Sequence, residues 1–121
     1  MKLVIAGSRT IHCDQTVLDG LNQILDHHGW PSDIISGGAA GVDQSAKRIA
    51  EYNNVNYIEC KPIYKHTKDR GAPLRRNDDM AIMGDVLLAV WDGKSPGTGH
   101  MIRTMKQRNK PVYIIYPNSA A

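Results

Sequence analysis

The chain has 121 residues and a mass of 13.4 kDa, which is the size of a single domain (residues 1–121) with its own hydrophobic core. Hydrophobic residues make up 41% and charged residues 22%, which is typical of a globular protein and excludes a disordered one. No apolar run reaches the ~20 residues that cross a bilayer, and the apolar start is too short for a signal peptide. Cys13 and Cys60 lack the spacing of metal ligands, so we expect no zinc or disulfide scaffold and a cytoplasmic protein.

The formal net charge of +3 is unevenly distributed. Residues 1–60 hold four Lys/Arg and seven Asp/Glu, whereas residues 61–121 hold eleven and five. Six of the basic residues lie between Lys61 and Arg76, together with His66. A basic cluster of this kind attracts phosphates or nucleic acid, or it is a solvated loop, and its position relative to the rest of the fold decides between the two.

Strand and helix patterns alternate in the first half of the chain. An apolar run at 3–6 predicts a buried strand, and the following helix, capped by Asp14, ends at Gly29. A strand at 33–36 leads into a glycine-rich segment and a helix that stops near residues 53–54. A third strand is predicted at 55–60, followed by the basic connection.

The second half continues this alternation. Pro73 is well placed in the first turn of a helix that runs to about Gly84. The segment 85–91 is apolar enough to be a fully buried strand, and a turn-rich loop at 92–99 follows it. Met101, Ile102 and Met105 mark the next helix, a last strand is predicted at 111–116, and residues 117–121 are expected to fray.

This order of elements predicts an α/β fold, a Rossmann-like three-layer sandwich with a five-stranded parallel sheet. Ligands of such sheets bind beyond the carboxyl ends of the strands. The segments that directly follow strands here are 8–9, 37–43, 61 onward and 92–99, and they are rich in glycine, hydroxyl and basic residues. We therefore expect one binding site at this edge.

The glycine segment is the strongest chemical signal. Gly37, Gly38 and Gly41 lie between a strand and a helix, where backbone without a Cβ can approach an anion and the first helix amides can bind it. A tight turn for close packing is the alternative reading. The loop from Gly93 to Gly99 repeats the arrangement after the fourth strand.

Two familiar nucleotide-binding motifs are absent. Gly93-Lys94-Ser95 looks like the end of a phosphate loop, but the earlier glycine that this motif requires is replaced by Leu88. No Gly-x-Gly-x-x-Gly opens either of the first two helices. An ordinary ATPase or nicotinamide dehydrogenase is therefore disfavoured.

Four segments in order resemble the SLOG superfamily, and among its members the small YspA/YpsA-related branch. They are Gly7-Ser8-Arg9, residues 35–43, Arg76-Asn77 with Met80, and residues 91–98. This Rossmann-like superfamily includes the Lonely Guy phosphoribohydrolases and the DNA-processing protein A family. The resemblance implies binding of nucleotides or nucleotide-derived, ADP-ribose-like molecules, and a bacterial or phage origin.

The resemblance also implies roles for individual side chains. Arg76 matches an arginine of the Lonely Guy enzymes, but their glutamate after the Gly-Thr pair has no counterpart beside Thr98, where Gly99 and His100 follow. The predicted ligand-binding residues are Gly7, Ser8, Arg9, Ser36, Gly37, Gly38, Gly41, Val42, Asp43, Arg76, Asn77, Trp91, Asp92, Gly93, Ser95, Gly97 and Thr98. Asp92 and Asp43 are the candidate catalytic residues, although each is also placed to cap a turn or helix.

Three functions remain open. The first is a module that binds a nucleotide-derived small molecule, and the second is an enzyme that cleaves an N-glycosidic bond with Asp92 or Asp43 in place of the missing glutamate. The third, binding of single-stranded nucleic acid, ranks last because only seven aromatic residues occur and few lie among the bases. We expect no cofactor, metal or membrane, no nucleic-acid partner, and a homo-oligomer, a dimer by resemblance.

Overall fold

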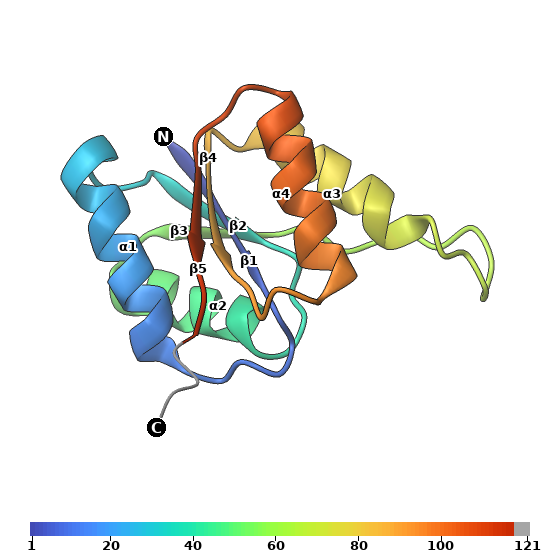
Figure 1. Ribbon diagram of the computed structural model, residues 1–121, viewed down its shortest axis with the longest axis horizontal. Coiled ribbons are helices and arrows are strands. Elements are labelled where there is room, and N and C mark those ends of the chain that lie inside the picture. Colours follow the sequence, from blue (N-terminus) through green and yellow to red (C-terminus); the bar gives the residue numbers. More distant parts are fainter. Residues whose placement is uncertain (118–121) are drawn as a thin grey trace.

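The computed structural model describes residues 1–117, which form a five-stranded, all-parallel sheet with helices on both faces (Figure 1). The predicted fold class is thereby confirmed. The expected frayed tail lies outside the described residues except for Pro117. The elements are β1 (Lys2–Gly7), α1 (Asp14–His28), β2 (Asp33–Ser36), α2 (Val42–Tyr52), β3 (Asn56–Glu59), α3 (Ala72–Met83), β4 (Val86–Val90), α4 (Pro96–Gln107) and β5 (Val112–Ile115).

The strand order is β3-β2-β1-β4-β5, so β1 lies at the centre of the sheet. The chain runs outward from β1 through β2 to β3, then returns across the sheet to place β4 on the other side of β1. This reversal creates a topological switch point between β1 and β4. Ligands of open α/β sheets bind at the carboxyl ends of the strands beside such a point.

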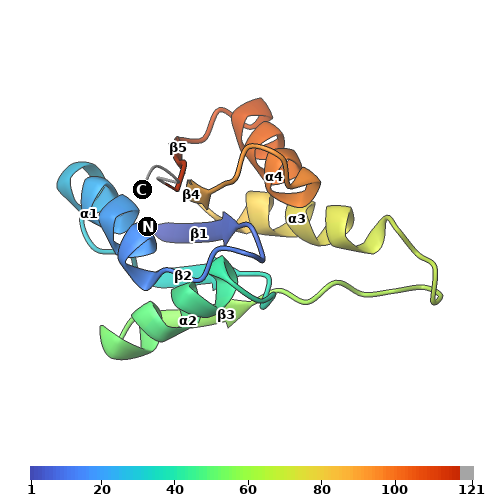
Figure 2. The same ribbon diagram turned by 60° about the horizontal axis from the view of Figure 1, so that its bottom comes forward.

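Alternating side chains of the central strands pack into two separate hydrophobic cores, one on each face of the sheet. Leu3 and Ile5 of β1 pack with Leu88 of β4 and with α1 and α2, whereas Val4 and Leu87 pack with α3 and α4. These five side chains are completely buried. Because both faces of β1 and β4 are covered, these strands are continuous apolar runs rather than alternating ones, which explains why the sequence reveals them so clearly. Figure 2 shows the two helix pairs on opposite faces of the sheet.

Two predicted helix starts need correction. Cys13 is the N-cap of α1 and Asp14 is the first helical residue, so Asp14 does not cap this helix; its carboxylate accepts hydrogen bonds from Arg48 and Ser45 of α2. The helix α4 begins at Pro96, so residues 96–99 form its first turn and not the end of a loop. Proline at the start of a helix loses no backbone hydrogen bond there.

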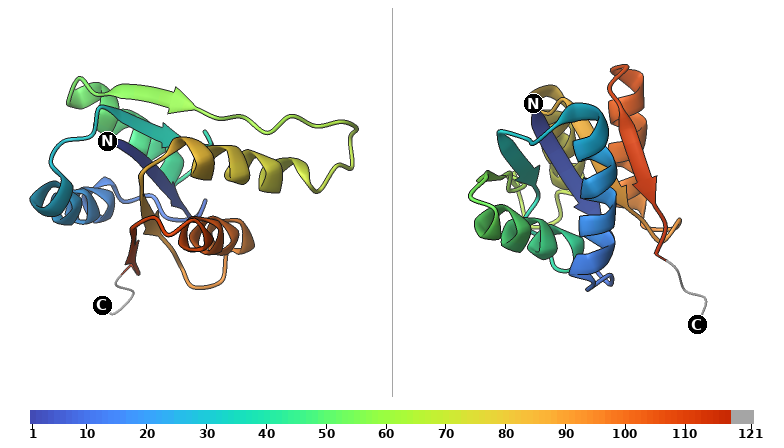
Figure 3. Two further views of the ribbon diagram at one scale, coloured as in Figure 1. Left: turned by 90° about the horizontal axis from the view of Figure 1, so that it is seen from above. Right: turned by 90° about the vertical axis from the view of Figure 1, so that its left-hand side faces the viewer.

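Residues 61–71 leave the end of β3, turn, and return to α3 as a long arm that projects from the body of the molecule (Figures 2 and 3). We call this segment the arm. Its conformation depends on Asp69, whose carboxylate accepts hydrogen bonds from the amides of Lys65 and Gly71 at 3.0 and 3.1 Å and forms an ion pair with Arg75. The Arg75 guanidinium also donates to the carbonyl of Ile63 at 3.3 Å. Both sides of the arm are thus tied to one carboxylate.

Within residues 1–117, none of the helices combines the length and the apolar composition needed to cross a bilayer.

Candidate ligand-binding cavity

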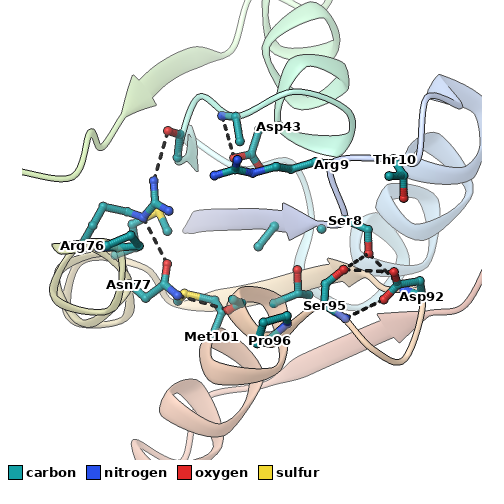
Figure 4. Close-up of a pocket in the computed structure, with 18 residues that line it drawn as sticks. Ser8, Arg9, Thr10, Asp43, Arg76, Asn77, Asp92, Ser95, Pro96 and Met101 are labelled. Carbon is teal, nitrogen blue, oxygen red and sulfur yellow. Dashed lines mark hydrogen bonds between the residues drawn. The ribbon is translucent and has the colours of Figure 1, made fainter. Parts of the chain in front are cut away.

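A cavity of about 370 Å³ opens at the carboxyl ends of β1, β2 and β4 (Figure 4). The glycine-containing loop 37–41 and the segment 93–99, which comprises a short loop and the first turn of α4, both contribute to its wall, so they converge on one site. Eleven of the predicted site residues line the cavity: Gly7, Ser8, Arg9, Gly37, Asp43, Arg76, Asn77, Asp92, Ser95, Gly97 and Thr98. This shared edge follows from the parallel sheet, in which every strand ends on the same side.

Arg76 and Asn77 of α3 tie three parts of the wall together. The Nη1 atom of Arg76 donates to the carbonyls of Gly37 and Cys60 at 3.1 and 3.2 Å, and its Nε donates to the side-chain oxygen of Asn77. The Asn77 amide in turn donates to the carbonyl of Gly97 at 3.2 Å. The Nη2 atom of Arg76 has no hydrogen-bond partner among the described residues, so one face of this fixed guanidinium is available to a ligand.

Gly37 leaves room for the close approach of this arginine. A Cβ at position 37 would collide with Nη1 of Arg76 and lie 3.2 Å from Oδ2 of Asp43. Because Gly37 has no side chain, the Arg76 guanidinium can reach the backbone of the 37–41 loop and donate to the Gly37 carbonyl.

Asp43 is a buried carboxylate in the cavity wall, with 7% of its surface exposed. Burial raises its pKa to about 6, against the opposing effects of a hydrogen bond from the amide of Ala39 at 3.1 Å and of the nearby charges of Arg76 and Arg9. A carboxyl group with this pKa exchanges a proton near neutral pH. Asp43 is thus the lining carboxylate best suited to acid–base chemistry.

Asp92 contrasts with Asp43, because hydrogen bonds lower its pKa. Its Oδ1 accepts hydrogen bonds from the amides of Lys94 and Ser95, both at 2.8 Å, and its Oδ2 accepts one from the Ser95 hydroxyl. These bonds, those from the Ser95 and Lys94 amides above all, lower the pKa of Asp92 to about 2. The Asp92 carboxylate therefore binds the loop amides that we expected to bind an anionic ligand. With its lowered pKa, it is also a poor proton donor.

Hydroxyl groups and one free guanidinium complete the polar wall. The hydroxyl oxygens of Ser8 and Ser95 lie 3.0 Å apart, within hydrogen-bond distance, which links the segments that follow β1 and β4. Figure 4 shows the Arg9 side chain extending across the cavity toward Asp43. Within residues 1–117, Arg9 forms neither a side-chain hydrogen bond nor an ion pair, so its charge is not neutralised by a direct partner.

The floor of the cavity is apolar. Ala6 of β1, Met80 of α3 and Met101 of α4 line it, and all three are buried. After Gly97 and Thr98, α4 continues with His100, whose ring nitrogen lies 3.2 Å from the Asn77 amide nitrogen, and no carboxylate stands there. An apolar floor below a polar, positively charged rim suits a molecule with a flat face and an anionic group.

Six predicted site residues lie outside the lining of the cavity: Ser36, Gly38, Gly41, Val42, Trp91 and Gly93. The Ser36 hydroxyl bonds to that of Tyr57, and the Trp91 indole donates to the carbonyl of Ser95 at 3.0 Å. Gly41, at a φ of 74°, allows the start of α2 to pack against the backbone of Arg9.

Seven lining residues were not predicted as site residues: Ala6, Thr10, Ala39, Pro73, Met80, Pro96 and Met101. Pro73 and Pro96 were predictable from a simple signal, because the first turns of helices that follow parallel strands face this edge. In residues 1–117, no three His, Cys, Asp or Glu side chains gather in a way that would hold a metal ion.

Comparison with known structures shows the same fold in two proteins. The Moco carrier protein from Chlamydomonas reinhardtii is 21% identical with a TM-score of 0.67, over 97% of this chain and 77% of that one. The single-stranded DNA-binding DNA processing protein A from Helicobacter pylori is 23% identical with a TM-score of 0.70, over 94% of this chain and 64% of that one.

The sequence itself matches more closely elsewhere. Gene 61 protein of Mycobacterium phage D29 is 31% identical over an alignment of 118 residues, and the match covers 92% of this chain and 93% of the phage protein. A family model described as the YspA, cpYpsA-related SLOG family matches residues 1–66, which include β1, the first glycine loop and Asp43. The chain belongs to the YspA, cpYpsA-related SLOG family.

Proposed function

We propose that the cavity binds a nucleotide or nucleotide-derived, ADP-ribose-like small molecule and that the protein acts as a binding module. The observation that carries the proposal is the pair of guanidinium groups, Arg9 and Arg76, above the apolar floor at the switch point of the sheet. Guanidinium groups bind phosphate through two parallel hydrogen bonds and are not matched by lysine.

The parts of such a ligand correspond to different regions of the wall. The free Nη2 of Arg76 and the unpaired Arg9 supply positive charge for a phosphate. The carboxylate of Asp43 and the hydroxyls of Ser8 and Ser95 are suited to ribose hydroxyls, which both donate and accept hydrogen bonds. The floor at Met80 and Met101 offers an apolar surface to a base.

The relatives support a ligand of this kind without identifying it. The Chlamydomonas protein of the same fold is described as a carrier of a small molecule, the molybdenum cofactor, and the Helicobacter protein as a single-stranded DNA-binding protein. We expect a free small molecule to bind this chain.

Titration calorimetry with AMP, ADP and ADP-ribose, and with adenosine as the uncharged control, tests the proposal. We expect the phosphate-bearing ligands to bind and Arg76→Ala to weaken them roughly 10- to 100-fold, the loss of one hydrogen-bonded charge. Arg108→Ala is the matched control, because this arginine is exposed at the far end of α4. Equal affinities of the Arg76 variant and the wild type would contradict the proposal.

An enzymatic alternative is cleavage of an N-glycosidic bond, and the raised pKa of Asp43 is the observation that favours it. Asp92 is unsuited to that role because its carboxylate is already saturated by backbone amides. Incubation with the same nucleotides and detection of released base separates the two functions. Release that disappears in Asp43→Asn supports the enzyme, and binding without release supports the module.

Single-stranded nucleic acid is the alternative partner, because a protein of the same fold is described as binding single-stranded DNA. Fluorescence anisotropy with a labelled single-stranded oligonucleotide at two salt concentrations addresses it, because phosphate contacts weaken steeply with salt. We expect AMP or ADP-ribose to bind under conditions in which the oligonucleotide does not. Tight, salt-dependent oligonucleotide binding with no nucleotide binding would overturn this order.

A further inference from the structure

We propose that the arm and the outer face of α3 form a self-complementary interface with a second copy of this chain. In this arrangement the arm of each copy lies along α3 of the other. The proposal rests on the exposed surface of residues 61–83 and is independent of the ligand in the cavity.

Exposed apolar side chains are concentrated on these two elements. Of the seven large hydrophobic side chains that are exposed in residues 1–117, four lie here: Ile63 at 82%, Tyr64 at 56%, Leu74 at 43% and Ile82 at 60% exposure. Leu74 and Ile82 are eight residues apart on α3, with Asp78 halfway between them, so they share one face of the helix. Clustered exposed apolar side chains mark interaction sites, whereas scattered ones need no explanation.

The charges of the two elements are opposite. The arm exposes Lys65, His66, Lys68 and Arg70, as well as Lys61, which pairs with Glu59 at 3.5 Å, while its only carboxylate, Asp69, pairs with Arg75. The outer face of α3 exposes Asp78 and Asp79, and neither has a hydrogen bond or ion pair within residues 1–117. Each element therefore carries the charge, and the apolar side chains, that complement the other.

Complementarity between two different elements of one chain is what a two-fold dimer requires. In such a dimer the same patch is used by both copies, so an arm-to-helix contact occurs twice. The lengths agree as well: the six outgoing residues 61–66 span at most about 20 Å, and a 12-residue helix such as α3 is about 18 Å long.

The arm has the fixed shape that an interface element needs. The Asp69 carboxylate, with 9% of the side chain exposed, binds both sides of the arm and the base of α3. An element that is already ordered loses little conformational freedom when it docks. Although the arm leaves the body of the molecule, its contacts are internal, and its apolar side chains Ile63 and Tyr64 remain uncovered.

A nucleic-acid strand on the arm would explain the basic residues and the exposed Tyr64, on which a base can stack, but not the aliphatic side chains. It would leave Ile63, Leu74 and Ile82 without a partner, and the carboxylates of Asp78 and Asp79 would repel its phosphates. A second copy accounts for the apolar and the charged residues together. The same interface would brace α3, whose inner face carries Arg76 and Asn77 into the cavity.

Charge exchange tests the interface. The arm variant Lys65→Glu/Lys68→Glu and the helix variant Asp78→Lys/Asp79→Lys are each placed against a like charge in their own homodimer. Light scattering coupled to size exclusion, over a concentration series, is expected to show a dimer for the wild type and a dissociation constant raised more than about 10-fold for each variant. An equimolar mixture of the two variants is expected to recover the dimer, because both contacts are then restored.

Two controls keep the result decisive. Lys106→Glu/Arg108→Glu makes the same change of charge on exposed residues of α4, and we expect its mass to equal that of the wild type. Ile63→Asp tests the apolar contact at a side chain that packs against nothing in the single chain, should a charge variant fail to fold. A monomeric wild type, a mixture that stays monomeric, or an arm variant that loses oligonucleotide binding with unchanged mass would overturn the proposal.

Discussion

The buried carboxyl group of Asp43 is expected to make the fold less stable as the pH rises. Its pKa is about 6 in the folded protein because of burial, whereas the ordinary value is 3.8. Between these two values the folded state holds a proton that the unfolded state has already lost. The stabilisation from this group is therefore complete below about pH 4 and is lost as the pH rises through about 6. A shift of about two units corresponds to roughly 3 kcal/mol.

Asp43→Asn isolates this contribution. Asparagine keeps the shape and the acceptor for the Ala39 amide but cannot ionise. We expect the free energy of unfolding of the variant, relative to wild type, to increase by roughly 3 kcal/mol between about pH 4 and pH 7. Urea denaturation at a series of pH values measures this difference. Asp14 and Asp92, whose pKa values are lowered, titrate in both proteins, so their contributions to the pH dependence cancel in the difference between variant and wild type. A difference that does not change with pH would refute the reasoning and show that Arg9 and Arg76 fully compensate the buried charge.

Two further substitutions test the wall and the fold. Gly37→Ala places a methyl group on the Arg76 guanidinium, so we expect nucleotide affinity to fall about as far as in Arg76→Ala, measured by calorimetry, with the fold retained in circular dichroism. Gly97→Ala is its stability control, since a Cβ there meets nothing within 4 Å. Lys110→Met removes an ammonium group that donates to the carbonyls of Ala81, Ile82 and Gly84 at 2.7, 3.2 and 2.6 Å, and is expected to cost about 1–3 kcal/mol in urea denaturation. Lys106→Met, exposed on α4, should change stability little, and an equal effect of both would contradict a specific role for Lys110.

The position of the cavity was predictable from the sequence because the residues that mark it lie in short, contiguous segments. Continuous apolar runs identify buried parallel strands, and the polar residues directly after them must share one edge. Ser8, Arg9 and Gly37 were assigned to the site on this basis and line the cavity. Arg76 and Asn77 do not follow a strand directly, and they were assigned from the family resemblance.

What could not be predicted depends on packing between segments that are distant in the chain. The sequence offered no sign that Asp92 would bind the amides of its own loop, or that burial would outweigh two arginines at Asp43. The role of Asp69 in shaping the arm was also missed, because its partners come from both sides of a turn. In each case a carboxylate found donors that only the folded chain brings to it.

The hydrogen bonds that Asp43 and Asp92 accept from nearby backbone amides have a consequence for how ligand specificity can change. Each carboxylate binds amides of its own loop, so the walls are held in shape by the chain itself and not by a guest molecule. A side chain that lines the cavity without forming part of the core, such as Thr10, can then be exchanged without loosening the loops around it. Point mutations in the lining can therefore change which ligand the cavity binds while the backbone conformation of the loops stays the same.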